Sequence, residues 1–214
     1  MTADIVTVSS RAEGWIVDLA VRGWLRIDEI AAATRTSKRM IYYYFGSKEG
    51  LFIAVLESAY QAIRDAERRL QLETVEPIEG MRRLIRFSWN YYFEHPEFTA
   101  LLNSENLQQG RHVQGSQKLA AVHSPLLESL RKLLLRGESD GVFRAGVDPM
   151  QIYISISGLG YFYVSNRYTL SAMFQRDLIA PDCLDARLDH ITQMVLAYLR
   201  PEPAEAPRRR KEKK

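Results

Sequence analysis

The chain has 214 residues, of which 46% are hydrophobic and 10% aromatic, so it can form one large domain, or a small domain joined to a larger one, around a buried core. No apolar run approaches the length of a membrane helix, and the N-terminus lacks the basic and apolar stretches of a secretion signal. A single cysteine, Cys183, excludes an internal disulfide and is typical of a small packing residue. We therefore expect a cytoplasmic protein without a membrane partner.

The net charge of +3 is concentrated near the C-terminus. Residues 200–214 hold seven cations and three acidic residues, which leaves 22 cations and 23 acidic residues for residues 1–199. The basic balance therefore gives no argument that the folded body binds nucleic acid. Three prolines and no large apolar residue predict a disordered basic tail over 200–214. This tail would either attract phosphates weakly or only keep the protein soluble.

Apolar residues recur at helical spacing almost everywhere, and no segment alternates like a convincing strand. The sequence predicts an all-α protein of about nine helices. Ser47 and Asp148 are expected N-caps, and Pro77 and Pro149 are expected first residues of helices. The stretch GRHVQGSQ is expected to be a polar break. In chain order, we expect helices near residues 15–23, 28–33, 37–45, 47–70, 77–95, 96–108, 118–136, 149–170 and 184–199.

Residues 27–52, IDEIAAATRTSKRMIYYYFGSKEGLF, carry four cations and three consecutive tyrosines, with no acidic residue between Glu29 and Glu49. Two short helices separated by residues 34–36 have the length and composition of a helix-turn-helix. Ser37 is an expected N-cap that leaves the positive end of the second helix pointing outward, ready for a phosphate.

An inward-facing Ile41 and Phe45 would turn the opposite face of the second helix outward, with Lys38, Arg39, Tyr42 and Tyr43 on it. Lysine and arginine can reach guanine edges or phosphates, and tyrosine hydroxyls can donate to phosphates. On this interpretation the cations lack local partners because their counter-charge lies on DNA. An ordinary solvated helix face, with the tyrosines packed, remains the alternative on spacing alone.

Residues 27–57 resemble the TetR family of transcriptional regulators in order and spacing. The resemblance is carried by four groups of residues, namely Ile30-Ala31, Ser37-Lys38, Tyr42-Tyr43-Tyr44-Phe45 and Ser47-Lys48-Glu49. It implies a homodimeric, ligand-responsive regulator, expected to be a repressor that binds a palindromic double-stranded DNA operator. It further implies a three-helix DNA-binding head over 1–46 and a helical body over 47–199 for a small-molecule effector and for dimerisation.

The resemblance also implies which residues contact DNA. They fall on the second helix of the pair, its preceding turn and the start of the next helix: Thr36, Ser37, Lys38, Arg39, Tyr42, Tyr43, Tyr44 and Lys48. Met40 can offer only apolar contact, because a thioether has no strong donor. Arg35 stands where the family usually has glycine in the turn, and the first helix is shorter than usual, without the family's phenylalanine. A positive φ at Arg35 would strain the turn.

Aromatic and polar residues of the body are suited to line an effector pocket, which is usually apolar with a few polar groups. Core packing is the alternative for each of them. The predicted ligand-binding residues are Trp89, Tyr92, Phe93, Asn103, Asn106, His123, Tyr163 and Asn166. We expect no metal and no cofactor, because His112 and His123 are too isolated in the sequence for a metal site.

Small residues inside the helix that begins at Pro149 would let a second helix approach closely. They are Ser155, Ser157, Gly158 and Gly160. We expect part of this helix to form a dimer seam with the final helix, through Leu188, Ile191, Val195, Leu196 and Leu199. Space for a ligand beside the same helix is the rival interpretation.

Two function classes other than a regulator are compatible with a helical chain. An enzyme is disfavoured, because the sequence has no glycine-rich phosphate loop on a βαβ unit, no metal-spaced His/Cys cluster and no nucleophile elbow. A helical adaptor or small-molecule-binding protein that never contacts DNA is the alternative that stays open.

Overall fold

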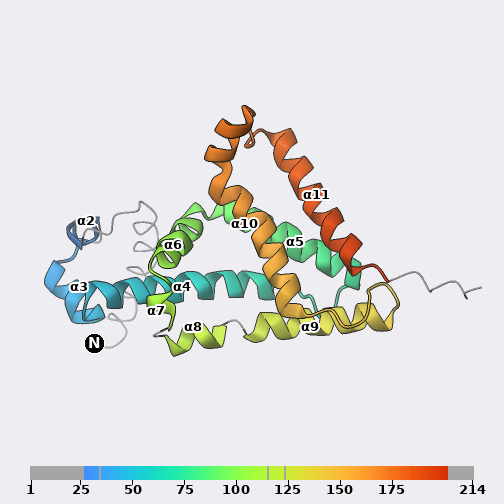
Figure 1. Cartoon of the computed structure of the whole chain (residues 1–214). Coiled ribbons are helices and arrows are strands. Elements are labelled where there is room, and N and C mark those ends of the chain that lie inside the picture. Colours follow the sequence, from blue (N-terminus) through green and yellow to red (C-terminus); the bar gives the residue numbers. More distant parts are fainter. Residues whose placement is uncertain (1–26, 34, 115, 123, 202–214) are drawn as a thin grey trace, which may run out of the picture.

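The computed structural model describes residues 27–33, 35–114, 116–122 and 124–201 (Figure 1). This part of the chain contains helices and no strand, which confirms the all-α class. The helix expected near residues 15–23 and all but the first two residues of the expected tail lie outside it. The described helices are α2 (Ile27–Ala33), α3 (Lys38–Phe45), α4 (Lys48–Arg68), α5 (Pro77–Glu94), α6 (Pro96–Leu107), α7 (Arg111–Gln114), α8 (Gln117–Val122), α9 (Ser124–Ser139), α10 (Pro149–Phe174) and α11 (Pro181–Leu199).

The long helix α4 connects the two ends of the molecule (Figure 1). Helices α2 and α3 lie at its N-terminal end, α8 and α9 run alongside it, and α5, α10 and α11 pack together beyond its C-terminal half. One hydrophobic cluster joins α2 and α3 to α4, α5 and α6, and a second joins α5, α9, α10 and α11. Any displacement of α4 in the body is therefore carried directly to α2 and α3.

Side-chain caps fix where the main helices begin. The Ser47 hydroxyl accepts from the Gly50 amide at 3.0 Å, and Asp148 accepts from the Met150 amide at 2.8 Å, so both predicted N-caps are confirmed. Glu76 caps α5 by accepting from two first-turn amides, ahead of Pro77. Proline suits the first turn, because the amide that it lacks would have no partner within the helix.

The helix expected over 118–136 is wrong as a single element. The chain forms two helices here, α8 and α9, and α9 continues to Ser139. Pro125 is the second residue of α9, and a proline in the middle of one continuous helix would remove a hydrogen bond and clash with the preceding turn. The expected polar break also contains the short helix α7, and α11 begins at Pro181 rather than near residue 184. These additions raise the described helices to ten.

Helix α7 is held by a buried carboxylate. Glu105 accepts from the backbone amides of His112 and Val113 at 2.8 and 3.0 Å, and it lies 2.7 Å from the His112 Nδ1. The His112 ring packs edge-on against Phe52 of α4, with 4.7 Å between ring centroids. The α6–α7 turn is thereby fixed to the first turns of α4.

The prediction that the apolar residues of the final helix form a dimer seam is wrong, because these residues are buried within their own chain. Ile191, Val195 and Leu199 are 1%, 3% and 0% exposed and belong to the core of their own chain. Leu188 and Leu196 pack against the same core. The sequence pattern identified the buried face of α11, but helix α5 of the same chain covers that face, so a second copy cannot use it.

The hydropathy of the described helices is relevant to the expectation that the protein has no membrane partner. None of these helices has both the length and the apolar character that crossing a membrane requires.

Candidate functional site

Helix α3 is anchored by one buried side chain. Ile41 is 4% exposed and packs in a cluster with Ile30 of α2 and with Leu51 and Val55 of α4. Phe45 lies partly buried against the same cluster. The expected inward face of α3 is therefore confirmed, and its position fixes the opposite face at the surface.

The outward face of α3 carries the predicted cations and tyrosines. Tyr42 and Tyr44 are 44% and 45% exposed, and Tyr43 is 78% exposed. The rings of Tyr43 and Tyr44 meet edge-to-face with 5.4 Å between their centroids. Aromatic rings that stay exposed forgo the stabilisation that burial would give. Their exposure therefore favours a role in contact with a partner. Thr36, Ser37, Lys38, Arg39 and Lys48 are exposed as well.

The expectation that no cation of this segment has a local partner is wrong for Lys38. Its ammonium forms an ion pair with Asp28 of α2, because the helix-turn-helix brings the first turn of α2 beside the start of α3. Both side chains remain more than half exposed, so the pair stabilises the fold little and can be exchanged for a phosphate. Within the described part of the chain, Arg35, Arg39 and Lys48 form no ion pair.

The two helix starts on this surface are capped as the sequence predicts. The Ser37 hydroxyl accepts from the Met40 amide at 3.3 Å, which places the positive end of α3 next to the exposed residues. Lys48 is the first residue of α4 and directly follows the Ser47 cap. The predicted contact residues thus lie on the exposed surface of α3, in the turn before it and at the adjoining end of α4.

Gly50 is a residue of this site that the sequence reasoning missed. A Cβ atom on Gly50 would lie 2.0 Å from the carbonyl oxygen of Phe45, so only glycine lets α4 start so close to the end of α3. Arg35 has a φ of 51°, the left-handed conformation that was expected to strain a residue other than glycine. Both positions set the angle at which α3 is presented.

Comparisons with known proteins match this geometry. Residues 22–55 match the family model of bacterial regulatory proteins of the tetR family, and residues 77–195 match a tetracyclin repressor-like C-terminal domain. The HTH-type transcriptional repressor NicS of Pseudomonas putida is 41% identical over 175 residues, which is 82% of each chain. The chain belongs to the TetR family of transcriptional regulators.

Solved structures of other proteins share the fold at low sequence identity. The crystal structure of SCO4942 from Streptomyces coelicolor has a TM-score of 0.65 and 19% identity, covering 90% of this chain and 98% of that one. AibR, which was solved in complex with isovaleryl coenzyme A and operator DNA, has a TM-score of 0.59 and 17% identity over 86% of this chain and 97% of its own.

The aromatic members of the predicted ligand-binding set lie close together in this TetR-family body, and Tyr92 also contacts Tyr161, the partner of Asn103. Trp89 and Tyr163 pack with 5.4 Å between ring centroids, Trp89 and Phe93 with 5.0 Å, and Tyr92 is buried nearby on α5. Asn103 donates to Ser165 at 3.2 Å and accepts from Tyr161. The side-chain amides of Asn106 and Asn166 each bond a carbonyl of their own helix, and His123 lies outside the described residues.

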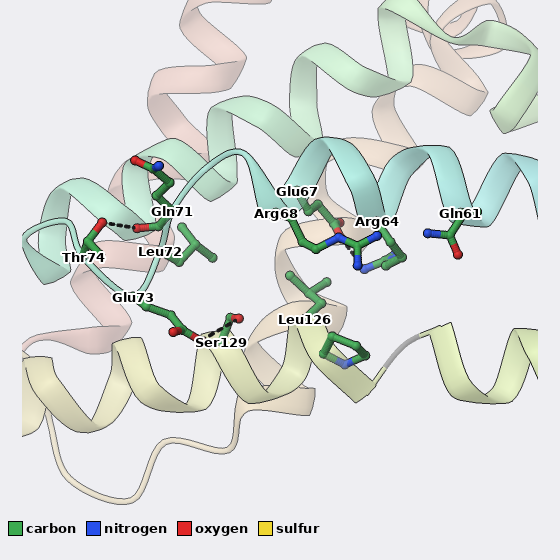
Figure 2. A pocket seen from close by; sticks show the side chains of 11 residues that line it. Gln61, Arg64, Glu67, Arg68, Gln71, Leu72, Glu73, Thr74, Leu126 and Ser129 are labelled. Carbon is green, nitrogen blue, oxygen red and sulfur yellow. Dashed lines mark hydrogen bonds and ion pairs between the residues drawn. The ribbon is translucent and has the colours of Figure 1, made fainter.

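A cavity of about 640 Å³ lies elsewhere in the body, between the C-terminal half of α4, the loop that follows it, and α9 (Figure 2). Figure 2 shows Arg64, Glu67 and Arg68 grouped on α4, opposite Leu126 of α9. None of the predicted ligand-binding residues that the structure describes lines this α4–α9 cavity.

Arg64 and Glu67 form a buried ion pair at the α4–α9 cavity, with 2.6 Å between Nη1 and Oε2 and with side chains 6% and 3% exposed. Burial raises the pKa of Glu67 to about 7, and the Arg64 charge opposes that rise. One signal in the sequence could have found this pair, since Glu67 continues the buried i, i+4 register of Ala59 and Ile63.

Proposed function

We propose that this protein is a ligand-responsive transcriptional repressor that acts in the cytoplasm. It binds a palindromic operator as a homodimer and releases it when a small molecule binds in the body. The observation that carries the proposal is the outward face of α3. There Arg39, Tyr42 and Tyr43 are exposed, while Ile41 packs against α2 and α4 on the opposite side of the helix. Such a face suits the major groove, where arginine reads guanine and tyrosine contacts phosphates and thymine methyls.

Selection of bound sequences from random DNA tests the operator. A homodimer that presents two copies of α3 selects two inverted half-sites about one helical turn apart. Affinity for the selected site should fall by orders of magnitude between low and moderate salt, because six to ten neutralised phosphates release about as many counterions. Recovery of no sequence preference, with a flat salt response, would exclude a DNA-binding regulator and leave the helical adaptor.

Exposed apolar residues of α10 and α11 support the homodimer. Ile154 and Phe162 of α10 are 53% and 57% exposed, and they lie on one helix face with Gly158, where a Cβ would meet nothing within 4 Å. Met194 and Tyr198 of α11 are 46% and 52% exposed. Large apolar surface of this kind marks an interaction site rather than a free monomer surface. We propose that this outer face, not the buried face of α11, forms the seam.

Sedimentation of Phe162→Glu tests the seam. A charge placed in an apolar interface leaves an unpaired group there, so the variant is expected to be monomeric while keeping its helical content. Leu107→Glu on α6 is the matched control, because Leu107 is already 86% exposed and the charge there stays in water. A dimeric Phe162→Glu protein would place the interface elsewhere.

The effector acts through α4 in this proposal, since α4 carries α3 at one end and contacts α5, α8 and α9 along its length. A ligand that binds more tightly to one orientation of α4 shifts the spacing of the two heads toward that orientation. The aromatic and amide residues named from the sequence remain a prediction for the effector site.

A further inference from the structure

The α4–α9 cavity has the size of a small-molecule site. Its volume of about 640 Å³ lies within the usual range for ligand pockets. Leu72, Pro125 and Leu126 are the apolar residues of its wall, and the other eight lining residues, Arg64 and Glu67 among them, are polar or charged. Most of the lining surface is nevertheless apolar, which is usual for a pocket that orients a ligand.

The Arg64 guanidinium has donors to spare at this wall. One Nη2–H donates to the Tyr153 hydroxyl of α10 at 2.9 Å. Nη1 lies 2.6 Å from Glu67 Oε2, but the two groups are not aligned as a hydrogen bond, and the buried Nε has no hydrogen-bond partner among the described residues. A buried charged group normally has its donors satisfied, so the unused donors of Arg64 call for an acceptor that the described part of the chain does not provide.

The charges around the cavity leave its inner wall positive. Arginine keeps its proton at any physiological pH, whereas burial raises the pKa of Glu67 to about 7, so near neutral pH this carboxylate compensates Arg64 only in part. At the rim the charges are already paired, since Arg68 contacts Asp65 and Glu73 contacts Lys132. The uncompensated positive charge therefore belongs to Arg64.

We propose that the α4–α9 cavity is the effector site and that it takes a small organic anion, a carboxylate on an apolar body. The carboxylate binds the Arg64 guanidinium, whose planar array of donors matches two carboxylate oxygens. The apolar body lies against Leu72 and Leu126. This inference rests on the proposed function, because it names the ligand class of the same regulator.

Binding at Arg64 has a direct route to the DNA-binding surface. A ligand carboxylate replaces Glu67 as the partner of Arg64, and a ligand body between α4 and α9 changes the distance between these helices. Arg64 also contacts Tyr153, so α4 is coupled to α10, which carries part of the proposed dimer seam. The ligand thus acts on α4, which orients α3, and on α10, which contributes to the proposed dimer seam.

Thermal unfolding of the full chain with matched carboxylates and amides tests the ligand class. The probes are benzoate, 2-naphthoate and decanoate, each compared with its primary amide, which has nearly the same shape but no charge. At about ten times Kd, a carboxylate should raise Tm by about 3–6 °C, while its amide leaves Tm unchanged. If no carboxylate raises Tm at about 10 mM, or if acid and amide act alike, the proposal is overturned.

Two variants separate a role in binding from a role in folding. Glu67→Gln removes the competing carboxylate but keeps Arg64 charged, so carboxylate affinity is expected to stay or to rise. The double variant Arg64→Gln with Glu67→Gln replaces the buried charges by a neutral pair, which is expected to fold, and it should lose the carboxylate-dependent shift. Loss of the shift in Glu67→Gln, or its survival in the double variant, contradicts the assignment.

Failure of this inference can be distinguished from failure of the proposed function. Operator binding is measured in the same samples by gel shift, with Arg39→Ala as the variant that should lose DNA without losing the carboxylate shift. A protein that binds a palindrome but no carboxylate refutes only the ligand class. A protein that binds the carboxylate but no DNA refutes the regulator.

Discussion

Arg39 on α3 and Arg64 on α4 are the same side chain in opposite surroundings. Arg39 is exposed on a helix that is held from behind by Ile41, and it forms no ion pair within the described part of the chain. Arg64 is 5% exposed and lies between Glu67 and Tyr153. An exposed cation is free to meet a partner as large as DNA, whereas a buried one can serve only a ligand small enough to enter a cavity. We therefore expect two separable binding activities in one helical protein, one at Arg39 and one at Arg64.

The largest expected effect is loss of operator binding in Arg39→Ala. Removing one base or phosphate contact costs about 1–3 kcal/mol, and a homodimer loses it at both half-sites. Gel-shift affinity measures the loss, with sedimentation to show that the dimer persists. Arg82→Ala on α5 is the matched control, because Arg82 is also exposed but does not lie on α3. Unchanged affinity in Arg39→Ala would remove α3 from the interface.

Glu67→Gln is expected to change the pH dependence of folding. Because the pKa of Glu67 is raised from 4.5 to about 7 in the folded chain, the folded state keeps this proton up to a higher pH than the unfolded state does. The protonated Glu67 therefore stabilises the folded state at low pH. This stabilisation is lost as the pH rises from about 4.5 to about 7, by at most about 1.4 kcal/mol per pH unit.

Unfolding by denaturant at a series of pH values measures this difference. The stability of the parent protein relative to Glu67→Gln should fall between about pH 5 and about pH 7 and then level off. Other titrating carboxylates act equally in both proteins and cancel in the comparison. Parallel pH profiles would show that Glu67 is ionised throughout and that Arg64 is fully compensated.

Gly50→Ala is expected to weaken the junction between α3 and α4. The new methyl group would meet the Phe45 carbonyl at 2.0 Å, and backbone must move to make room, at a cost of about 1–3 kcal/mol. Operator affinity and Tm should both fall, while the carboxylate shift at Arg64 persists.

The smallest expected effect is a gain in stability for Arg35→Gly. Arg35 has a φ of 51°, which glycine adopts without strain, so the change should stabilise the fold by up to about 1 kcal/mol. Operator affinity should change little if Arg35 only completes the turn. A large fall in affinity with raised Tm would instead show that the Arg35 cation contacts DNA, extending the interface beyond α3.

The sequence predicted the cap and the exposed face of α3 well because its information is local. Ser37 caps the helix within three residues, and the i, i+4 spacing of Ile41 and Phe45 orients the outer face regardless of the rest of the chain. The same local reasoning misjudged Lys38, since its partner Asp28 lies across the turn. It also merged α8 with α9, because hydrophobic periodicity continues through a break that Pro125 requires.

What the sequence determined by itself is the helical class, the caps of the long helices and the residue types on the exposed face of α3, because each depends on neighbours within one or two turns. Only the tertiary structure decided which apolar stripe of α11 is core, why Gly50 must be glycine, and that Arg64 and Glu67 lie buried beside a cavity. These features depend on contacts between residues far apart in the chain, and the energies of burial and close approach are set by such contacts rather than by local spacing.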